Sequence, residues 1–419
     1  MKMTKYKLSE LVEVTRGASL SGQFYAEEGK LIRLTLGNFN MNGGGFKENT
    51  SKTDLYFTGT VRDEFILNEG DIITPLTEQS LGLLGTTARI PESGKYIQSQ
   101  DVALVRCKKG LLDPNFCYYL ISSSIVRQQL SAAAQQTKIR HTSPEKIKDC
   151  TVWVPDFDVQ KNIGRILTDI DNKIAINRQI NDNLEAMAKQ LYDYWFVQFD
   201  FPNEEGKPYK SSGGAMVWNE KLKRKIPQGW SNGILSDVAN ITMGQSPDGS
   251  SYNEDGEGII FYQGSTDFGL RFPDIRQYTT SPSRYANKGD ILMSVRAPVG
   301  ALNIANNDCC IGRGLSALSS KIGSMTHLYY LMNDFRLKFE GMNSAGTTFG
   351  SITKDELFSL PVIIPTKSVI LEFEQVCEPI FDKQMIIGEE INALTKQLNE
   401  LSPLLMNGQA TVNYHLSAC

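Results

Sequence analysis

Hydrophobic residues recur at intervals of three and four in two long stretches of the chain. The first stretch follows Pro155 and the second follows Pro365, and a proline is a natural place for a strand to stop and a helix to start. A stripe with this period runs along one face of an α-helix, as in a heptad seam. The pattern predicts two long amphipathic helices, of which 158–195 would span about 57 Å at 1.5 Å per residue. The stripes consist of Val159, Ile163, Ile166, Ile170, Ile174, Ile180, Leu184, Met187 and Leu191, and of Val369, Phe373, Val376, Ile380, Ile391, Leu394, Leu398, Leu401 and Leu405.

Neither stripe can remain exposed to water, and each is the obvious partner of the other. If the two helices pair antiparallel, one globular domain sits at each end of a rod. The other interpretation is that each helix packs only on its own domain, but the stripes are too long for one small domain to cover. We therefore expect a long antiparallel two-helix coiled coil.

The segments before each helix have a different pattern. Short runs rich in β-branched residues are bounded by Gly, Asn and Asp, which is typical of strands and turns, and Asn115–Leu130 and Met325–Phe339 are predicted to be helices. The loop segments 43–45 and 248–251 do not lead from a strand into a helix, so a nucleotide-phosphate site is not indicated. The pattern predicts compact α+β domains, with strands at Leu31–Leu36, Asp71–Thr74, Val102–Arg106, Ile259–Tyr262 and Asp290–Val295.

The chain contains an internal repeat. Short segments of the first half return in the second half in the same order, offset by 210 to 227 residues, and a period this long indicates a duplicated domain with its connecting helix. The matched segments are Leu8–Leu11 with Leu235–Val238, Arg16–Gly17 with Met243–Gly244, Glu69–Ile73 with Lys288–Leu292, Tyr118–Leu120 with Tyr329–Leu331, Val152–Pro155 with Val362–Pro365, and Ile180–Asn181 with Ile391–Asn392. The predicted divisions are a first domain at 1–155, a central helix at 156–200, a linker at 201–226, a second domain at 227–365, a C-terminal helix at 366–406 and a tail at 407–419.

Charge separates the domains from the helices. The chain has 419 residues and a net charge of −4, which argues against a general polyanion binder. Residues 1–155 carry a net charge of +3 and 201–365 are neutral, whereas 156–200 carry −3 and 366–419 carry −4. If nucleic acid is bound, the two domains bind it and the acidic helices have another role. The alternative is that these differences are ordinary variation on solvated surfaces.

Other classes of protein are not indicated. No apolar run approaches 18 residues and the first segment is too polar for a signal peptide, so we expect a cytoplasmic protein without a membrane contact. None of the 7 cysteines forms a CxxC pair and the 3 histidines stand apart, so neither a zinc site nor a disulfide framework is predicted.

The centre of the chain carries motifs of a known family. Tyr192–Pro202 reads YDYWFVQFDFP, Gly206–Gly214 reads GKPYKSSGG, and Lys223–Trp230 reads KRKIPQGW just before the second Leu235–Asp237. This region strongly resembles the specificity subunits of type I restriction–modification enzymes. The resemblance extends over essentially the whole chain, as recognition domain, helix, recognition domain and helix.

The resemblance implies separate roles for the two domains, the long helices and the partner subunits. Each recognition domain would read one half of a split, asymmetric site on double-stranded DNA. The paired helices would fix the unread spacer and dock two methyltransferase subunits, and through these the motor-nuclease subunits. The chain itself would be non-catalytic, with no cofactor of its own, and S-adenosylmethionine, ATP and Mg²⁺ would bind to the partners. In agreement, the sequence has no Asn- or Asp-Pro-Pro-aromatic motif and no GxxxxGK[ST] loop.

Candidate DNA contacts are Arg, Lys, Asn, Gln and hydroxyl residues in the predicted loops, since these side chains reach base edges and phosphates. Arg140 follows a small-residue run and precedes Ser143, a probable helix start, which suits a phosphate contact. We expect Arg140→Ala to weaken DNA binding without unfolding the chain. The full set of candidates is Arg33, Asn38, Asn40, Gln79, Arg89, Lys138 and Arg140 in the first domain, and Gln263, Arg271, Arg296, Arg313, Thr347 and Thr348 in the second.

An aromatic cluster at the end of the first long helix is a candidate partner-docking surface or helix-junction plug. Its members are Tyr194, Trp195, Phe196 and Phe199. The alternative is simple core packing against the first domain.

Two other functions fit parts of the sequence. A non-enzymatic coiled-coil scaffold with two protein- or glycan-binding domains would explain the duplication and the helices, but not the central motifs. A fused enzyme would require an active site that the sequence does not reveal.

Overall fold

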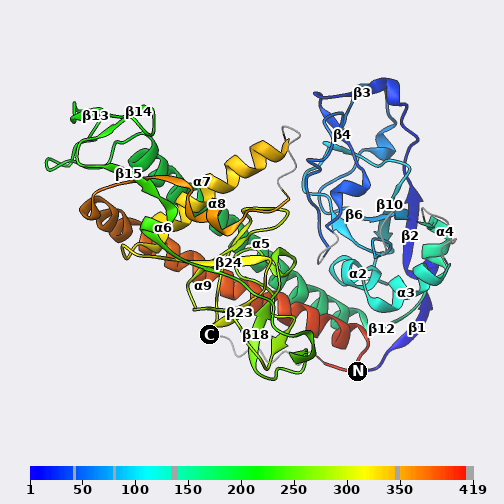
Figure 1. The fold of residues 1–419 in the computed structure, drawn as a ribbon. Helices are drawn as coiled ribbons and strands as arrows, with labels where there is room; N and C mark the ends of the chain where they lie inside the picture. Colours follow the sequence, from blue (N-terminus) through cyan, green and yellow to red (C-terminus); the bar gives the residue numbers. More distant parts are fainter. Residues whose placement is uncertain (41–43, 79–81, 134–139, 345–349, 412–419) are drawn as a thin grey trace, which may run out of the picture. The chain divides into compact units, whose positions relative to one another are not determined.

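The computed structural model describes residues 1–40, 44–78, 82–133, 140–344 and 350–411, with backbone alone for 340–344. The chain divides into two compact units (Figure 1). The first unit comprises Met1–Ala175 and Ala393–Cys419, and the second comprises Ile176–Asn392. The two long helices, α5 (Phe157–Tyr192) and α9 (Lys367–Met406), therefore each contribute to both units.

The domain of the first unit is built on a four-stranded sheet in the order β2-β10-β6-β8. A second sheet has the order β3-β5-β4-β9, and two shorter pairings join β1 to β12 and β7 to β11. Short helices complete the domain. The elements are β1 (Thr4–Lys7), α1 (Leu8–Leu11), β2 (Val12–Arg16), β3 (Tyr25–Ala26), β4 (Leu31–Arg33), β5 (Tyr56–Phe57), β6 (Ile72–Pro75), β7 (Thr77–Glu78), β8 (Ala88–Arg89), β9 (Tyr96–Ile97), β10 (Val102–Cys107), α2 (Pro114–Ile121), α3 (Ser124–Ala133), β11 (Arg140–His141), α4 (Pro144–Lys148) and β12 (Thr151–Val154).

The domain of the second unit repeats this topology. Its main sheet has the order β16-β24-β21-β22, its second sheet the order β17-β19-β18-β23-β20, and β15 pairs with β25. The elements are β15 (Ser231–Ile234), α6 (Leu235–Val238), β16 (Ala239–Met243), β17 (Tyr252–Asn253), β18 (Ile259–Tyr262), β19 (Tyr278–Thr279), β20 (Tyr285–Ala286), β21 (Ile291–Ser294), β22 (Leu302–Ile304), β23 (Cys309–Ile311), β24 (Leu315–Ser320), α7 (Met325–Ser344), α8 (Lys354–Phe358) and β25 (Pro361–Ile364).

The repeat extends to the register of the strands. In the first domain Leu104 pairs with Thr15, and in the second Ala317 pairs with Thr242. In both domains the second sheet contains one parallel pair, β4 with β9 and β18 with β23, among antiparallel neighbours. The α+β class and the internal duplication predicted from the sequence are therefore confirmed.

The first matched segment has a clear local role. In both copies it forms a single helical turn, α1 or α6, whose third residue is acidic. The Glu10 carboxylate accepts a hydrogen bond from the backbone N–H of Lys7 at 2.6 Å, and that of Asp237 accepts one from Ile234 at 2.8 Å. These carboxylates satisfy N–H groups that the start of a helix leaves free.

Within each unit the long helices run antiparallel. In the first unit Ile163 and Leu167 of α5 share a core with Leu401 and Leu405 of α9. In the second unit, contacts move to lower residue numbers on α9 as they advance along α5. Asn177 donates to Glu390 at 2.8 Å, Gln384 donates to Glu185 at 2.9 Å, and Tyr192 packs on Phe373.

Three segments differ from the sequence-based expectation. The helix expected at 115–130 is two helices, α2 and α3, because the Ser122 and Ser123 hydroxyls bond backbone carbonyls at the break. Helix α5 ends at Tyr192 and continues as a π-helical turn, η4 (Asp193–Val197). The expected linker, 201–226, is folded and contains the hairpin of β13 (Met216–Asn219) and β14 (Arg224–Pro227).

Among the described residues, no helix is long and apolar enough to cross a membrane. The same part of the chain contains no group of three or more His, Cys, Asp or Glu side chains that could hold a metal ion.

Candidate nucleic-acid interface

Three candidate DNA-binding residues of the second domain lie on one cluster of loops. Gln263 follows β18, Arg296 follows β21 and Arg313 follows β23, and all three side chains are exposed. Strands β18 and β23 are parallel neighbours, so the loops after them lie at the same edge of the sheet. The backbone N–H of Val295 donates to the carbonyl of Gly314 at 2.9 Å, which brings the Arg296 loop to the same place.

Glycines make this close approach of loops feasible. A Cβ atom at Gly314 would lie 2.6 Å from the carbonyl oxygen of Gln263, and one at Gly312 would lie 3.0 Å from the Cα of the same residue. Because only a residue without a side chain fits here, the two glycines hold Gln263 and Arg313 side by side. We define Gln263, Arg296 and Arg313 as the loop cluster of the second domain.

The first domain has a hollow of about 330 Å³ beside the corresponding loops. Thr35 after β4 and Ser99 and Gln100 after β9 contribute to its wall, together with the exposed Lys52. Arg16 donates from Nε to the carbonyl of Gln100 at 2.8 Å and is itself exposed. Sequence reasoning did not select Lys52, Gln100 or Arg16 as contacts, although Arg16-Gly17 was one of the repeated segments.

Two candidates in the first domain are buried and hold their own loops. Arg33 pairs with Asp54 at 3.1 Å and its guanidinium lies 3.7 Å from the centre of the Tyr25 ring. Asn38 accepts from the backbone N–H of Thr35 at 2.9 Å and donates to the carbonyl of Lys47 at 3.2 Å. The polar atoms of both side chains are engaged inside the domain, and their contact with DNA stays a prediction. Asn40 is half-buried on the same loop.

Arg140 is also engaged inside the first domain. Its guanidinium pairs with the buried Glu78 carboxylate at 3.1 Å. The other oxygen of Glu78 accepts from the backbone N–H groups of Gly82, Leu83 and Leu84. Removal of Arg140 would leave a buried carboxylate without its cation, which is strongly destabilising. The structure therefore leads us to expect that Arg140→Ala destabilises the first domain, in contrast to the expectation from the sequence.

Two other candidate arginines lie where a domain meets the long helices. The guanidinium of Arg89 lies 4.6 Å from the ring centre of Tyr118, and that of Arg271 lies 5.3 Å from the ring centre of Tyr329. Tyr118 and Tyr329 are matched positions of the repeat, although the two arginines are not. Stacking on an aromatic ring is a typical role for a guanidinium. The buried Arg271 therefore contacts the long helices from the domain, and its contact with DNA stays a prediction.

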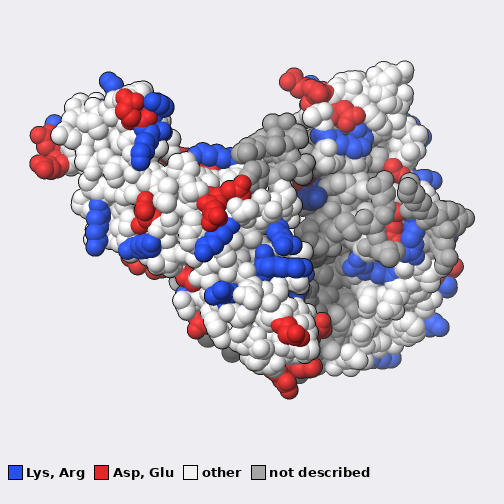
Figure 2. All heavy atoms as spheres, in the orientation of Figure 1, with Lys and Arg blue, Asp and Glu red and all other residues white. Residues whose placement is uncertain are grey.

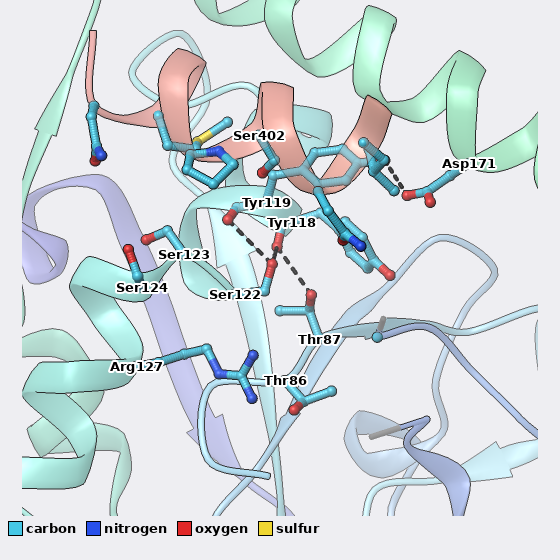
Figure 3. Close-up of a pocket in the computed structure, with 16 residues that line it drawn as sticks. Thr86, Thr87, Tyr118, Tyr119, Ser122, Ser123, Ser124, Arg127, Asp171 and Ser402 are labelled. Atoms are coloured by element: carbon cyan, nitrogen blue, oxygen red, sulfur yellow. Dashed lines mark hydrogen bonds between the residues drawn. The ribbon is translucent and has the colours of Figure 1, made fainter. Parts of the chain in front are cut away.

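Figure 3 shows the crevice at this junction in the first unit. It has a volume of about 270 Å³ and is lined by the first domain, by Asp171 of α5 and by Ser402 of α9. The hydroxyl of Tyr119 donates to the Asp171 carboxylate, and the Thr87 hydroxyl donates to the carbonyl of Tyr118 at 3.0 Å. Burial, reinforced by Asp171, raises the pKa of Tyr119, so this phenol keeps the proton it donates.

The remaining DNA candidates, Gln79, Lys138, Thr347 and Thr348, lie outside the described residues. On the face drawn in Figure 2, lysine and arginine side chains alternate with aspartate and glutamate. We define the candidate interface of the second domain by the geometry of its loops.

The aromatic cluster after α5 is mostly core. Trp195, Phe196 and Phe199 are buried, whereas Tyr194 is 36% exposed. Phe196 packs on Phe373 of α9 at 4.9 Å between ring centres. The three buried residues close the end of the helix pair in the second unit, which agrees with the helix-junction plug expected from the sequence. They pack against α9 and Trp230 and not, as the core-packing alternative has it, against the first domain. Docking of a partner on this cluster stays a prediction.

Exposed hydrophobic residues on the long helices are a better candidate for partner docking. Ile176, Ile180 and Met187 of α5 are exposed, as are Val376 and Ile386 of α9. All five lie in the second unit. Ile180, Met187 and Val376 were part of the predicted stripes, so the stripes are wider than the faces that the helices bury in this chain.

Comparison with known proteins identifies related chains. The family model of the type I restriction modification DNA specificity domain matches residues 1–186 and 227–401. The putative type I restriction enzyme MjaX specificity subunit of Methanocaldococcus jannaschii is 31% identical over 384 residues, which cover 86% of this chain and 85% of the relative. The type I restriction enzyme HindI specificity subunit of Haemophilus influenzae is 20% identical, covering 75% and 81%.

Solved structures include one with a similar fold over nearly the whole chain. The crystal structure of the type I restriction–modification S subunit from M. genitalium aligns with a TM-score of 0.63 at 16% sequence identity. The alignment covers 97% of this chain and 96% of that chain. The likeness therefore extends over both copies of the repeat and both long helices.

Proposed function

Because the chain belongs to the family of type I restriction–modification DNA specificity domains, we propose that it is the DNA specificity subunit of such a complex. Each recognition domain binds one half of a bipartite, asymmetric DNA target. The curated relatives are specificity subunits, which favours this function over a coiled-coil scaffold with protein- or glycan-binding domains.

The observation that carries the proposal is the duplication. One chain holds two domains whose main sheets have the same strand order, and the family model matches each copy. Two domains with different loop side chains read two different sequences, because base-edge contacts depend on the side chains and not on the sheet beneath them. In the second domain, Gln263 and Arg313 are suited to base-edge hydrogen bonds and Arg296 to a phosphate.

The long helices dock the other subunits in this proposal. The exposed residues Ile176, Ile180 and Met187 offer an apolar surface, and the acidic charge of the helices discourages non-specific contact with DNA. Two methyltransferase subunits bind there and connect the chain to the motor-nuclease subunits. S-adenosylmethionine, ATP and Mg²⁺ are bound by these partners, and the chain itself catalyses no reaction.

An exchange of one domain tests the proposal. Residues 1–155 are replaced by the matching domain of a specificity subunit with a different target, and methylated bases are mapped across the host genome. The chimera is expected to change one half-site completely and to leave the other half-site and the spacer unchanged. The exchange point follows β12, which pairs with β1 of the same domain, so the junction separates no paired strands.

A strain without the gene is the control and should lose every methylated site of this target. A change in both half-sites, or in neither, would contradict the modular reading. Site-specific methylation by the isolated chain, without a partner, would contradict the non-catalytic role.

A further inference from the structure

A short loop of the second recognition domain lies on both long helices. Phe272 is buried against α9, where a Cβ atom at Gly388 would lie 2.8 Å from its Cε2 atom. The neighbouring Arg271 is 8% exposed, and its guanidinium lies 4.7 Å from the ring centre of Phe381, also on α9. We call Gly269–Pro273 the docking loop.

The docking loop is fixed to the main sheet of its domain. The backbone N–H of Ile304 in β22 donates to the carbonyl of Arg271 at 2.9 Å. The Asn303 side chain, from the same strand, donates to the carbonyl of Gly269 at 3.1 Å. A displacement of the loop on the helices is therefore transmitted to the sheet, and with it to the loops that follow the strands.

One carboxylate oxygen joins the docking loop to the helices. Oε2 of Glu185 on α5 accepts from Gln384 of α9 at 2.9 Å and from the Tyr330 hydroxyl of α7 at 3.2 Å. The same oxygen lies 3.5 Å from Nη1 of Arg271. Glu185 thus connects both long helices with the docking loop and with a helix of the recognition domain. Hydrogen bonds to a charged acceptor are the strong ones.

The surroundings of Glu185 indicate that its carboxylate contributes much of the attraction between the docking loop and the long helices. A cavity of about 650 Å³ lies beside it, and its lining combines apolar residues with the polar side chains of Asn181 and Asn333. Nε and Nη2 of Arg271 and Oε1 of Gln384 are buried and have no hydrogen-bond partner in the structure. The hydrogen bonding between the docking loop and the helices is therefore incomplete at this point. Glu185 supplies the negative charge next to the buried guanidinium of Arg271.

The two copies differ at this point. In the first unit Tyr119, which matches Tyr330, donates to Asp171, an earlier residue of the same helix α5. The matched tyrosine hydroxyl is thus bound by a different residue of α5 in each copy, Asp171 in the first unit and Glu185 in the second.

We propose that Glu185 is a positioning residue, which fixes the orientation of the second recognition domain on the helix pair and so limits the spacer length that the assembled enzyme accepts. This inference rests on the proposed function. It assigns no base contact to Glu185. A change of one base pair moves a half-site by about 3.4 Å along the DNA axis and rotates it by about one tenth of a turn, so a domain held in one orientation rejects it.

Glu185→Ala tests the proposal in the assembled methyltransferase. Methylation is measured on duplexes that carry both half-sites with the native spacer and with spacers one base pair shorter or longer. The variant is expected to methylate the altered spacers at least fivefold better, relative to the native spacer, than the unchanged enzyme. The bases required in each half-site should stay the same.

Asp382→Ala is the control, because it removes an exposed carboxylate from α9 in the same unit, at a position that does not line the cavity beside Glu185. Gly388→Ala is an independent second variant, since its methyl group displaces Phe272 without touching Glu185. If Glu185→Ala fails to assemble, Glu185→Gln, which keeps the volume and removes the charge, decides the question together with Gly388→Ala. Both are expected to relax spacer choice, and Asp382→Ala is not.

Equal loss of activity on all spacers, with no change in their ratio, would overturn the proposal and leave Glu185 a purely structural residue. That outcome is distinct from a failure of the proposed function, in which no duplex with the two half-sites would be methylated even by the unchanged assembly.

Discussion

Arginine occupies three chemically different positions in this chain. Arg33 is buried beside Asp54, Arg271 stacks between aromatic rings, and Arg313 is exposed on a loop. All three were equivalent DNA candidates in the sequence. A guanidinium can donate hydrogen bonds to a carboxylate or a base edge and can also stack on an aromatic ring, so the residue type alone does not reveal its partner.

His327 gives the second unit a specific dependence on pH. Its ring packs 4.6 Å from that of Phe196, and burial lowers its pKa from 6.5 to about 4. The fold therefore holds the neutral form, and the unfolded chain binds a proton first as the pH falls. The stabilisation of the folded unit that follows from this lowered pKa is fully present above pH 6.5. It is lost progressively as the pH falls from 6.5 to 4, by about 3 kcal/mol at most.

His327→Phe tests this dependence, since it retains an aromatic ring and cannot titrate. The free energy of unfolding of the second unit is measured by denaturant titration from pH 7 to pH 4.5. The unchanged chain is expected to lose more stability over this range than the variant, because all carboxylates are common to both. Parallel curves for the two proteins would contradict a buried neutral imidazole.

At the scale of elements, the long helices are constrained by close contacts with the domains. Gly164 of α5 lies against the start of α2, where a Cβ atom would be 2.6 Å from the backbone nitrogen of Phe116 and 2.9 Å from Oδ1 of Asp113. That Asp113 oxygen accepts from the Phe116 N–H and caps α2. A glycine inside a helix is unfavourable by itself, so the contact explains its presence.

Gly164→Ala is expected to destabilise the first unit by about 1–3 kcal/mol, although alanine is the better helix former by about 1 kcal/mol. The methyl group would push α5 away from the capped end of α2. The measurement is the unfolding free energy, with Asn172→Ala as the control at an exposed position of the same helix. If Gly164→Ala gained as much stability as the control, the close contact between α5 and α2 would not require a glycine, and the prediction would be contradicted.

At the scale of the whole chain, the units are not continuous in sequence. The last turns of α9 complete the core of the first unit, where Leu405 and Met406 pack with Leu8 and other residues of the N-terminal domain. The second unit lies between the two parts of the first in the sequence. The stability of the first domain therefore depends on residues more than 200 positions away.

Two neighbouring variants, Leu405→Ala and Leu404→Ala, test whether the stability of the first domain depends on the end of α9. Leu405 is 3% exposed and Leu404 is 41% exposed. Leu405→Ala is expected to destabilise the first unit by about 2–5 kcal/mol, and Leu404→Ala by less than about 0.5 kcal/mol. Amide hydrogen exchange, read separately over 1–175 and 176–392, should show faster exchange for Leu405→Ala in the first range. Equal effects of the two variants would contradict the packing of α9 in the first unit.

The sequence by itself determined the class of fold, the duplication and the two long helices. Leu8–Leu11 and Leu235–Val238 repeat because each copy needs the same capped turn, and the helical stripes follow from a fixed number of residues per turn. These are local or periodic properties, and they are visible in the order of residues. The central motif around Trp195 likewise indicated the family.

Only the tertiary structure decided which polar residues serve the fold and which remain available to DNA. Arg140 meets Glu78, and Arg271 meets Glu185, through contacts between residues that are distant in the chain. Gln263 and Arg313 come together only because β18 and β23 pair in parallel. The free energy of a charged side chain depends on its burial and its neighbours, and neither of these is written in residue type or spacing.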